Sequence, residues 1–240
     1  MEWQGDGLIL NTSKHGENSA IIDVLTRDKG RHMGLVRGGR SRTMRPVLQA
    51  GNMVNVVWRA RLEDHLGAFS VEPHRMIVAG IIDDAHRLAG LTTITTLASL
   101  LPEREPHPRI YDASLLLIEH LQDDAIWPAV LVKWEMGLLD ELGFGLDLSK
   151  CAVSGETAGL THVSPRSGRA VCAREAAPWK DKLLALPAFI TGASGKASNA
   201  EIVQGLKLTG HFLARHIFEP RGVSAPEQRR RILRWLEQAD

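Results

Sequence analysis

The chain has 240 residues, of which 44% are hydrophobic and 24% charged, a composition typical of a globular protein with one large or two ordinary domains. Its longest apolar runs are far shorter than the roughly 20 residues that a membrane-spanning helix needs. Residues 1–7 lack the basic and apolar regions of a signal peptide. These features argue against a membrane protein and lead us to expect a cytoplasmic location.

The formal net charge of +1 conceals two segments of opposite sign. Residues 1–61 hold ten Lys/Arg and five Asp/Glu, whereas residues 62–240 hold nineteen and twenty-three. No acidic residue lies between Lys29 and Leu62. A local excess of arginine without carboxylates is typical of a surface that binds phosphate. The alternative is a basic loop that is merely solvated, but a stretch of this length also covers expected strands.

Residues 1–78 carry the pattern of β-strands. Short apolar or alternating runs are separated by turn residues, and only residues 40–50 leave room for a helix. The expected strands lie in 5–13, in 19–39 on either side of a turn at 27–30, in 51–62 and in 65–73. Five short strands favour a closed barrel of the OB type, a nucleic-acid-binding fold, because closure leaves no strand edge unpaired.

Two details of this region follow from residue type. Gly30 ends the turn and suits a positive φ angle. Val54, Val56 and Trp58 alternate with polar residues, so they are expected to face the barrel interior.

The rest of the chain, residues 79–240, is expected to form an all-α domain with a small turn-rich insert at 149–175. The expected helices are 79–101, 112–124, 128–144, 181–186, 198–218 and 225–239. The helix at 128–144 has one apolar face that should lie in the core, made of Leu131, Trp134, Leu138, Leu139 and Leu142. The predicted fold class is therefore α+β.

Signatures of catalysis are missing. The sequence has no H-E-x-x-H and no G-x-S-x-G, and Lys196 is followed by Ala197 where a phosphate-binding loop needs Ser or Thr. Asp83-Asp84 and Asp123-Asp124 are more typical of carboxylates at helix ends than of metal ligands. We therefore expect neither an enzyme nor a bound cofactor.

The insert has the layout of a zinc ribbon with half of its ligands replaced. A ribbon usually carries C-x-x-C twice, but here the pairs are Cys151 with Ser154 and Cys172 with Glu175. Two thiolates alone hold zinc weakly, so we expect no structural zinc and two buried, unpaired cysteines. If zinc were bound, His162 or Glu175 would have to complete the site.

These pieces, in this order, resemble the RecO family of bacterial DNA repair and recombination mediators. The resemblance covers essentially the whole chain and rests on "HGENSAIIDVLTRDKGRHMGLVRGGRSR", "LLDELGFGLDLSKCAVSGE", "HVSPRSGRAVCAREA" and "LTGHFLARHIF". It implies an N-terminal OB fold, a helical C-terminal domain and, in many members, a zinc ribbon. This chain departs from the zinc-binding members at Ser154 and Glu175.

The resemblance also implies a function that is not driven by ATP. The chain should bind single- and double-stranded DNA at the nucleoid, anneal complementary strands and, with RecR, help RecA to replace single-stranded DNA-binding protein (SSB). The acid-free stretch then becomes the DNA site. Its expected centre is Arg37, Arg40, Arg42 and Arg45, flanked by Lys29, Arg31, Arg59 and Arg61. Trp58 is the only aromatic residue of this stretch, so binding should depend on charge rather than base stacking.

A second implied partner is the acidic C-terminal tail of SSB, which ends in apolar residues. Such a tail needs an apolar pocket with a basic rim. We expect it near Arg230 and Arg234, which share one face of the last helix. The alternative is that Ile232, Trp235 and Leu236 only dock this helix onto the core.

Two other functions remain open at this point. An RNA-binding OB-fold protein would use the same barrel and the same basic loop. A non-catalytic adaptor would show no affinity for nucleic acid even at low salt.

Overall fold

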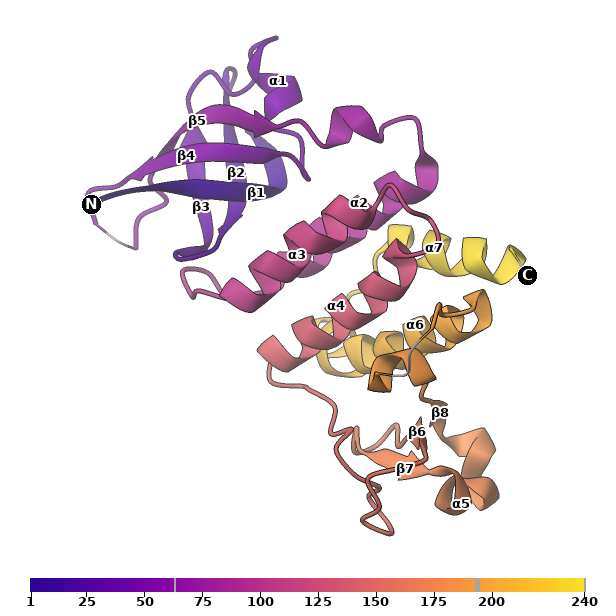
Figure 1. Ribbon diagram of the computed structural model, residues 1–240. Helices are drawn as coiled ribbons and strands as arrows, with labels where there is room; N and C mark the ends of the chain where they lie inside the picture. Colours follow the sequence, from indigo (N-terminus) through magenta and orange to yellow (C-terminus); the bar gives the residue numbers. More distant parts are fainter. Residues whose placement is uncertain (63, 193–194, 240) are drawn as a thin grey trace. The chain divides into compact units, whose positions relative to one another are not determined.

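A computed structural model describes residues 1–62, 64–192 and 195–239 of the chain (Figure 1). The chain divides into two compact units, Met1–Ile118 and Glu119–Asp240. The predicted boundary at residue 78 follows the last strand, whereas the first compact unit also includes the two helices that come next. No described helix is long and apolar enough to cross a membrane.

The first unit begins with five strands that close on themselves. They are β1 (Glu2–His15), β2 (Ser19–Thr26), β3 (Gly30–Val36), β4 (Met53–Arg59) and β5 (Ala68–Arg75). Neighbouring strands pair in the order β1-β2-β3-β5-β4. The last strand of this order, β4, also pairs with the first, β1, so the sheet is a closed barrel. All the pairs are antiparallel except β3 with β5. The five predicted strands are confirmed, although β1 extends beyond the expected range at both ends.

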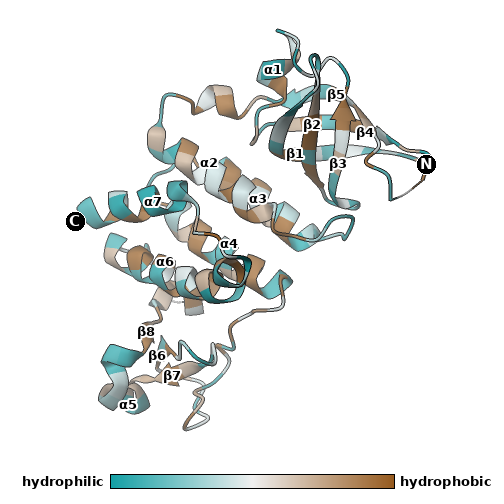
Figure 2. Cartoon of the chain, turned by 180° about the vertical axis from the view of Figure 1, so that it is seen from behind, coloured by the Kyte–Doolittle hydropathy of each residue, from teal (hydrophilic) through white to brown (hydrophobic). Residues whose placement is uncertain are grey.

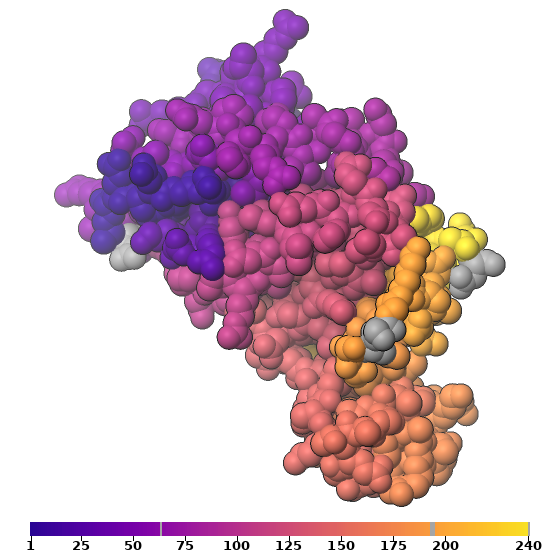
Figure 3. Space-filling view, in the orientation of Figure 1, coloured from indigo at the N-terminus to yellow at the C-terminus, as the bar shows by residue number. Residues whose placement is uncertain are grey.

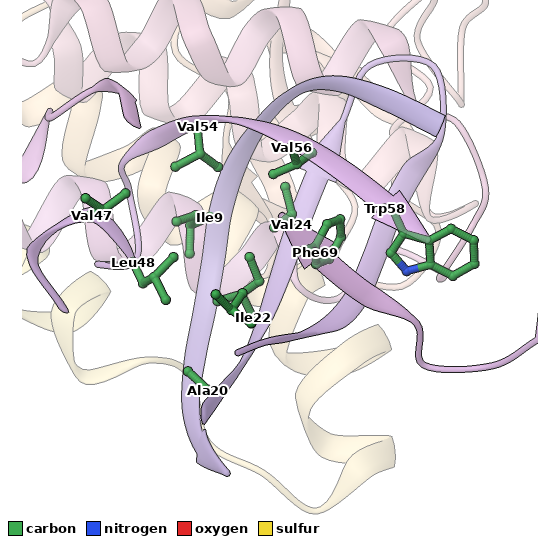
Figure 4. Packing of buried hydrophobic residues seen from close by; sticks show 11 residues of the cluster. Ile9, Ala20, Ile22, Val24, Val47, Leu48, Val54, Val56, Trp58 and Phe69 are labelled. Atoms are coloured by element: carbon green, nitrogen blue, oxygen red, sulfur yellow. The ribbon is translucent and has the colours of Figure 1, made fainter. Parts of the chain in front are cut away.

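The barrel interior is filled by alternate residues of the strands. Ile9, Ile22, Val24, Val54 and Val56 converge inside it, with Trp58 at one end (Figure 4). Trp58 is 1% exposed, so the predicted inward face of β4 is confirmed. Gly30 has φ +68°, as expected, and a side chain there would collide with the backbone of Glu105. This contact belongs to the first unit and brings the β2–β3 turn against the chain before α3.

A short helix and two longer ones complete the first unit. They are α1 (Met44–Val47), α2 (Ala85–Ala98) and α3 (Pro108–His120), with a 3₁₀ turn at Val78–Gly80. Asp84 caps α2 by accepting hydrogen bonds from the amides of His86 and Arg87, which is the helix-end role predicted for it. Asp112 of α3 pairs with Arg27 of the β2–β3 turn at 3.0 Å, which ties this helix to the barrel.

The second unit contains a helical core. Its helices are α4 (Trp127–Glu141), α6 (Asn199–Leu213) and α7 (Glu227–Gln238), with 3₁₀ turns at Ala188–Thr191 and Glu219–Arg221 and a π-helical segment at Ala214–Phe218. Four of the five predicted core residues of α4 are buried, namely Leu131, Trp134, Leu138 and Leu139. Figure 2 shows that α7, in contrast to α4, is hydrophilic along most of its length.

The insert forms a small three-stranded sheet within the second unit. Its elements are β6 (Leu160–Val163), β7 (Ala170–Cys172), α5 (Ala173–Ala176), a 3₁₀ turn at Ala177–Lys182 and β8 (Leu184–Ala185). The prediction of a helix at 181–186 was wrong. Residues 184–185 instead pair with His162 and Val163 of β6, because strand pairing outweighs the weak helix preference of so short a segment.

Candidate nucleic-acid interface

A basic hollow of about 890 Å³ opens beside the barrel, in the first unit. It lies between the second half of β1 and the segment that carries α1. Its cationic lining residues are Lys14, Arg40, Arg42 and Arg45. The lining residues found in the described part of the chain include no acidic and no aromatic side chain. The hollow therefore presents positive charge without a built-in counterion or a stacking surface.

Arg40 forms the wall of the hollow next to the β1–β2 turn. Its guanidinium donates hydrogen bonds to the carbonyl oxygens of Gly16 at 2.8 Å and of Glu17 at 2.7 Å. Its own amide donates to the carbonyl of Asn18. These hydrogen bonds attach the segment that carries Arg40 to the β1–β2 turn. Because all the acceptors are uncharged backbone groups, they do not neutralise the charge of the guanidinium.

The buried side chain of Asn52 fixes the α1 segment, which lines another side of the hollow. Its side-chain amide donates to the carbonyls of Pro46 at 2.9 Å and Val47 at 3.2 Å, and its side-chain oxygen accepts from the amide of Val78 at 3.0 Å. These bonds satisfy a polar side chain that is fully buried and fix the end of α1. Arg45, which lies on α1, is thereby held at the rim of the hollow.

Lys14 belongs to the hollow but was missed by the sequence interpretation, which ended the first strand at Ser13. Thr12 and Lys14 lie on the same face of β1, because side chains alternate along a strand. The Thr12 hydroxyl donates to the Leu48 carbonyl at 2.6 Å, so this face is turned toward the α1 segment. The alternation Thr12-x-Lys14 was the available signal, but only the fold shows what that face meets.

The central residues of the prediction are thus brought together, with one exception. Arg42 and Arg45 are exposed and line the hollow with Arg40. Arg37 follows β3 directly and is exposed, but it does not line the hollow. Among the residues that the structure describes, no carboxylate pairs with Arg37, Arg42 or Arg45. Their charge is therefore available to an anionic ligand.

The four predicted flanking residues lie elsewhere on the barrel. Lys29 and Arg31 lie at the start of β3, about 20 Å along the strand from Arg37. Arg59 and Arg61 lie where β4 ends, opposite Glu2 at the start of β1, and line a separate hollow of about 650 Å³. Arg59 pairs with Glu2 at 2.7 Å. The eight residues therefore do not form one continuous surface.

Arg31 is engaged inside the first unit. Its guanidinium lies 2.8 Å from Asp23 on β2 and 3.2 Å from Glu103, and its side chain is only 16% exposed. Two carboxylates thus compensate its charge. Asp23 is nearly buried, and one of its oxygens, Oδ1, finds no hydrogen-bond donor among the described residues. Burial raises the pKa of Asp23 to about 6, against the lowering effect of Arg31.

This raised pKa predicts how stability depends on pH. Between pH 7 and pH 5 the folded chain takes up a proton at Asp23 while the unfolded chain does not, so this group adds about 1 kcal/mol of stability. In Asp23→Asn that gain is expected to vanish. Burial lowers the pKa of neighbouring His32, which acts in the opposite direction, but His32 is present in both proteins and its effect cancels.

Urea unfolding of the wild type and of Asp23→Asn, followed by tryptophan fluorescence at both pH values, measures the difference. The same pH dependence in the two proteins would contradict a proton uptake at Asp23.

The apolar residues of the last helix pack inside the second unit. Ile232 and Leu236 are buried at 0% and 2%, and Trp235 stacks on Trp127 at a centroid distance of 5.7 Å. Arg230 and Arg234 both pair with Glu227 of the same helix, at 2.7 and 2.5 Å. The apolar residues thus dock α7 within the second unit, as the alternative interpretation held, and the use of Arg230 and Arg234 by a partner stays a prediction.

The residues of the insert do not fit a zinc ion. Cys151 and Cys172 lie together, but Glu175 pairs with Arg174 at 3.0 Å and the ring of His162 contacts Thr161. Within residues 1–62, 64–192 and 195–239, no three His, Cys, Asp or Glu side chains lie close enough to share a metal. Both cysteines are buried, as predicted, at 1% and 3% exposure.

Comparison with known proteins identifies the family. The models described as Recombination protein O N terminal and Recombination protein O C terminal match residues 1–77 and 82–225. The chain is 50% identical over 230 residues to the "DNA repair protein RecO" of Mesorhizobium japonicum, covering 95% of this chain and 91% of that protein. It is 48% identical over 234 residues to the protein of that name from Methylobacterium nodulans, covering 95% of each. The chain belongs to the recombination protein O (RecO) family.

Proposed function

We propose that this chain binds single- and double-stranded DNA during repair and recombination and acts as a mediator without catalysing a reaction. The observation that carries the proposal is the basic hollow, defined by Lys14, Arg40, Arg42 and Arg45 and free of acidic lining residues in the described chain. Its relatives are named as DNA repair proteins. The closed strand order supports an OB-type barrel, and the β1–β2 connection beside the hollow is one of the loops with which OB folds bind oligonucleotides.

The chemistry of the hollow favours binding that is independent of sequence. Guanidinium groups form paired hydrogen bonds with phosphate and stay charged at all physiological pH values. With no aromatic side chain among the described lining residues, bases gain little from stacking there. A site that contacts phosphates accepts single strands and duplexes alike, which is what a protein that anneals strands requires.

Strand annealing tests this function. The full chain should accelerate annealing of complementary DNA strands, both free and coated with SSB, and together with RecR it should help RecA to replace SSB. Annealing of RNA but not of DNA would point to an RNA-binding protein instead. No affinity for any nucleic acid at low salt would leave only an adaptor.

The second unit offers a better receptor for the SSB tail than α7. A hollow of about 460 Å³ has an apolar floor of Ile126, Ala129, Val130 and Phe189. Lys133 and Lys196 lie on its lining, with Asp123 as the one acidic group among the described lining residues. An apolar pocket with a basic rim suits a tail that is acidic and ends in apolar residues. We therefore place the proposed tail site here.

Lys133→Glu is accordingly expected to weaken binding of a labelled SSB tail peptide to the full chain by about tenfold, because it puts a like charge at the rim. Arg230→Glu with Arg234→Glu, which changes more charge on α7, should have little effect. Fluorescence anisotropy titrations compare the three proteins. If only the α7 double variant lost affinity for the peptide, the tail site would instead lie at Arg230 and Arg234.

A further inference from the structure

The insert contains a tight hydrogen-bonded turn that begins at one of its two cysteines. The turn runs from Cys151 to Glu156: the Cys151 amide donates to the Glu156 carbonyl at 2.7 Å, and the Gly155 amide donates to the Cys151 carbonyl at 3.0 Å. Gly155 has φ +78°, a conformation that favours glycine. The Ala152 amide donates to the Ala170 carbonyl, which fixes this turn against β7.

This turn brings the two thiols next to each other. The backbone amide of Cys172, at the end of β7, donates to the sulfur of Cys151 at 3.3 Å. The Ser154 hydroxyl lies 3.6 Å from the sulfur of Cys172. The two thiols and this hydroxyl therefore form one small cluster. With no third metal-binding side chain beside them in the described chain, the pair is free for chemistry of its own.

The environment of Cys151 favours the thiolate, which is the reactive form of cysteine. Burial raises the pKa of this thiol, but hydrogen bonds from the Ser154 hydroxyl and from nearby backbone amides, including that of Cys172, lower it to about 6. Both cysteines are buried, but Ser154, whose hydroxyl lies 3.6 Å from the sulfur of Cys172, is exposed, so the pair lies close to the surface. Figure 3 shows the insert, coloured salmon to orange, as a lobe of the second unit.

We propose that Cys151 and Cys172 form a reversible disulfide when the chain meets a hydroperoxide. The Cys151 thiolate attacks one peroxide oxygen, the O–O bond breaks, and a sulfenic acid forms while the other oxygen leaves after protonation, as water from hydrogen peroxide or as an alcohol from an organic hydroperoxide. The sulfur of Cys172 then attacks the sulfenic sulfur, the S–O bond breaks, and hydroxide leaves with the Cys172 proton as water. Two thiols lose two electrons and the peroxide gains them.

The experiment uses the reduced full chain, treated with hydrogen peroxide and then analysed by thiol titration in denaturant and by peptide mapping. Both thiols should disappear with loss of two hydrogens, a peptide cross-link between Cys151 and Cys172 should form within one chain, and dithiothreitol should restore both thiols. In Cys172→Ser, Cys151 should stop at a sulfenic acid that dimedone traps. In Cys151→Ser, Cys172 should react at least about tenfold more slowly, because only the Ser154 hydroxyl contacts its sulfur, whereas the sulfur of Cys151 also accepts a hydrogen bond from a backbone amide.

Ser154→Ala is the conservative control, since it leaves both cysteines in place and should only slow the reaction. Two thiols that survive peroxide in the folded wild type would overturn the proposal, as would cross-links between chains only. One zinc ion per chain that protects both thiols in the reduced protein would overturn it as well.

Discussion

Replacing Lys14, Arg42 and Arg45 together by glutamate is expected to weaken binding of single-stranded DNA by about 100-fold at ~0.1 M salt. Each phosphate contact on a single strand contributes a salt slope of about 0.7, which amounts to roughly 0.7 of a decade of affinity between ~0.1 M and 1 M salt. Three lost contacts therefore remove about two decades and lower the slope by about 2. Arg40 is left intact because its hydrogen bonds to Gly16 and Glu17 fix the loop.

The matched control is Lys29→Glu with Arg59→Glu and Arg61→Glu. It makes the same change in net charge, but at residues that lie away from the hollow. Its affinity should fall far less, by an amount typical of long-range charge repulsion at this salt concentration. Titrations at several salt concentrations give both the affinities and the slopes. An equal loss in the two triple variants would mean that overall charge, and not the hollow, governs binding.

Arg229→Met is expected to destabilise the second unit by about 3–5 kcal/mol, because it leaves a buried carboxylate without its partner. Glu135 is 0% exposed, and its two oxygens accept hydrogen bonds from Arg229 at 2.7 and 2.9 Å. Arg229 also donates to the Leu206 carbonyl at 2.6 Å and to the Thr209 hydroxyl at 3.1 Å. This network joins α4, α6 and α7 through groups that have almost no access to water.

Arg230→Met, one residue further along α7, is the natural control. Arg230 pairs with Glu227 at the surface, with 53% of its side chain exposed, so its loss should cost less than about 1 kcal/mol. The double variant Arg229→Met with Glu135→Leu should recover much of the lost stability, since it removes both charges. Denaturant unfolding of the full chains measures all three. If the two single arginine variants lost similar amounts of unfolding free energy, the buried pair would not be a main source of the stability of the second unit.

Local sequence patterns predicted much of the barrel and of the helical core. Alternation placed Trp58 inside the barrel, and the turn at 27–30 placed Gly30 at positive φ. These features depend on neighbouring residues, because side chains alternate along a strand and turns need particular φ angles. The prediction of a helix at 181–186 was wrong for the opposite reason. Residues 184–185 form a strand because they pair with β6, some 20 residues earlier in the chain.

The charge pattern also had a local and a non-local part. The acid-free stretch was visible in the sequence, and Arg40, Arg42 and Arg45 do line one hollow. What the sequence could not show is that Arg59 and Arg61 lie beside a separate hollow, or that β1 brings Lys14 to the hollow of Arg40, Arg42 and Arg45. Strand register and barrel closure decide which charges meet, and both arise from pairing between distant segments.

The sequence by itself determined most of the segments that become strands or helices and which of their faces are apolar, since propensity and periodicity act over a few residues. It did not determine the partners of the buried polar groups. Glu135 and Arg229 stand 94 positions apart, and each looks like an ordinary surface charge in its own helix. Only the packing of α4, α6 and α7 buries them together, and burial makes each charge depend on the other because neither can be solvated by water.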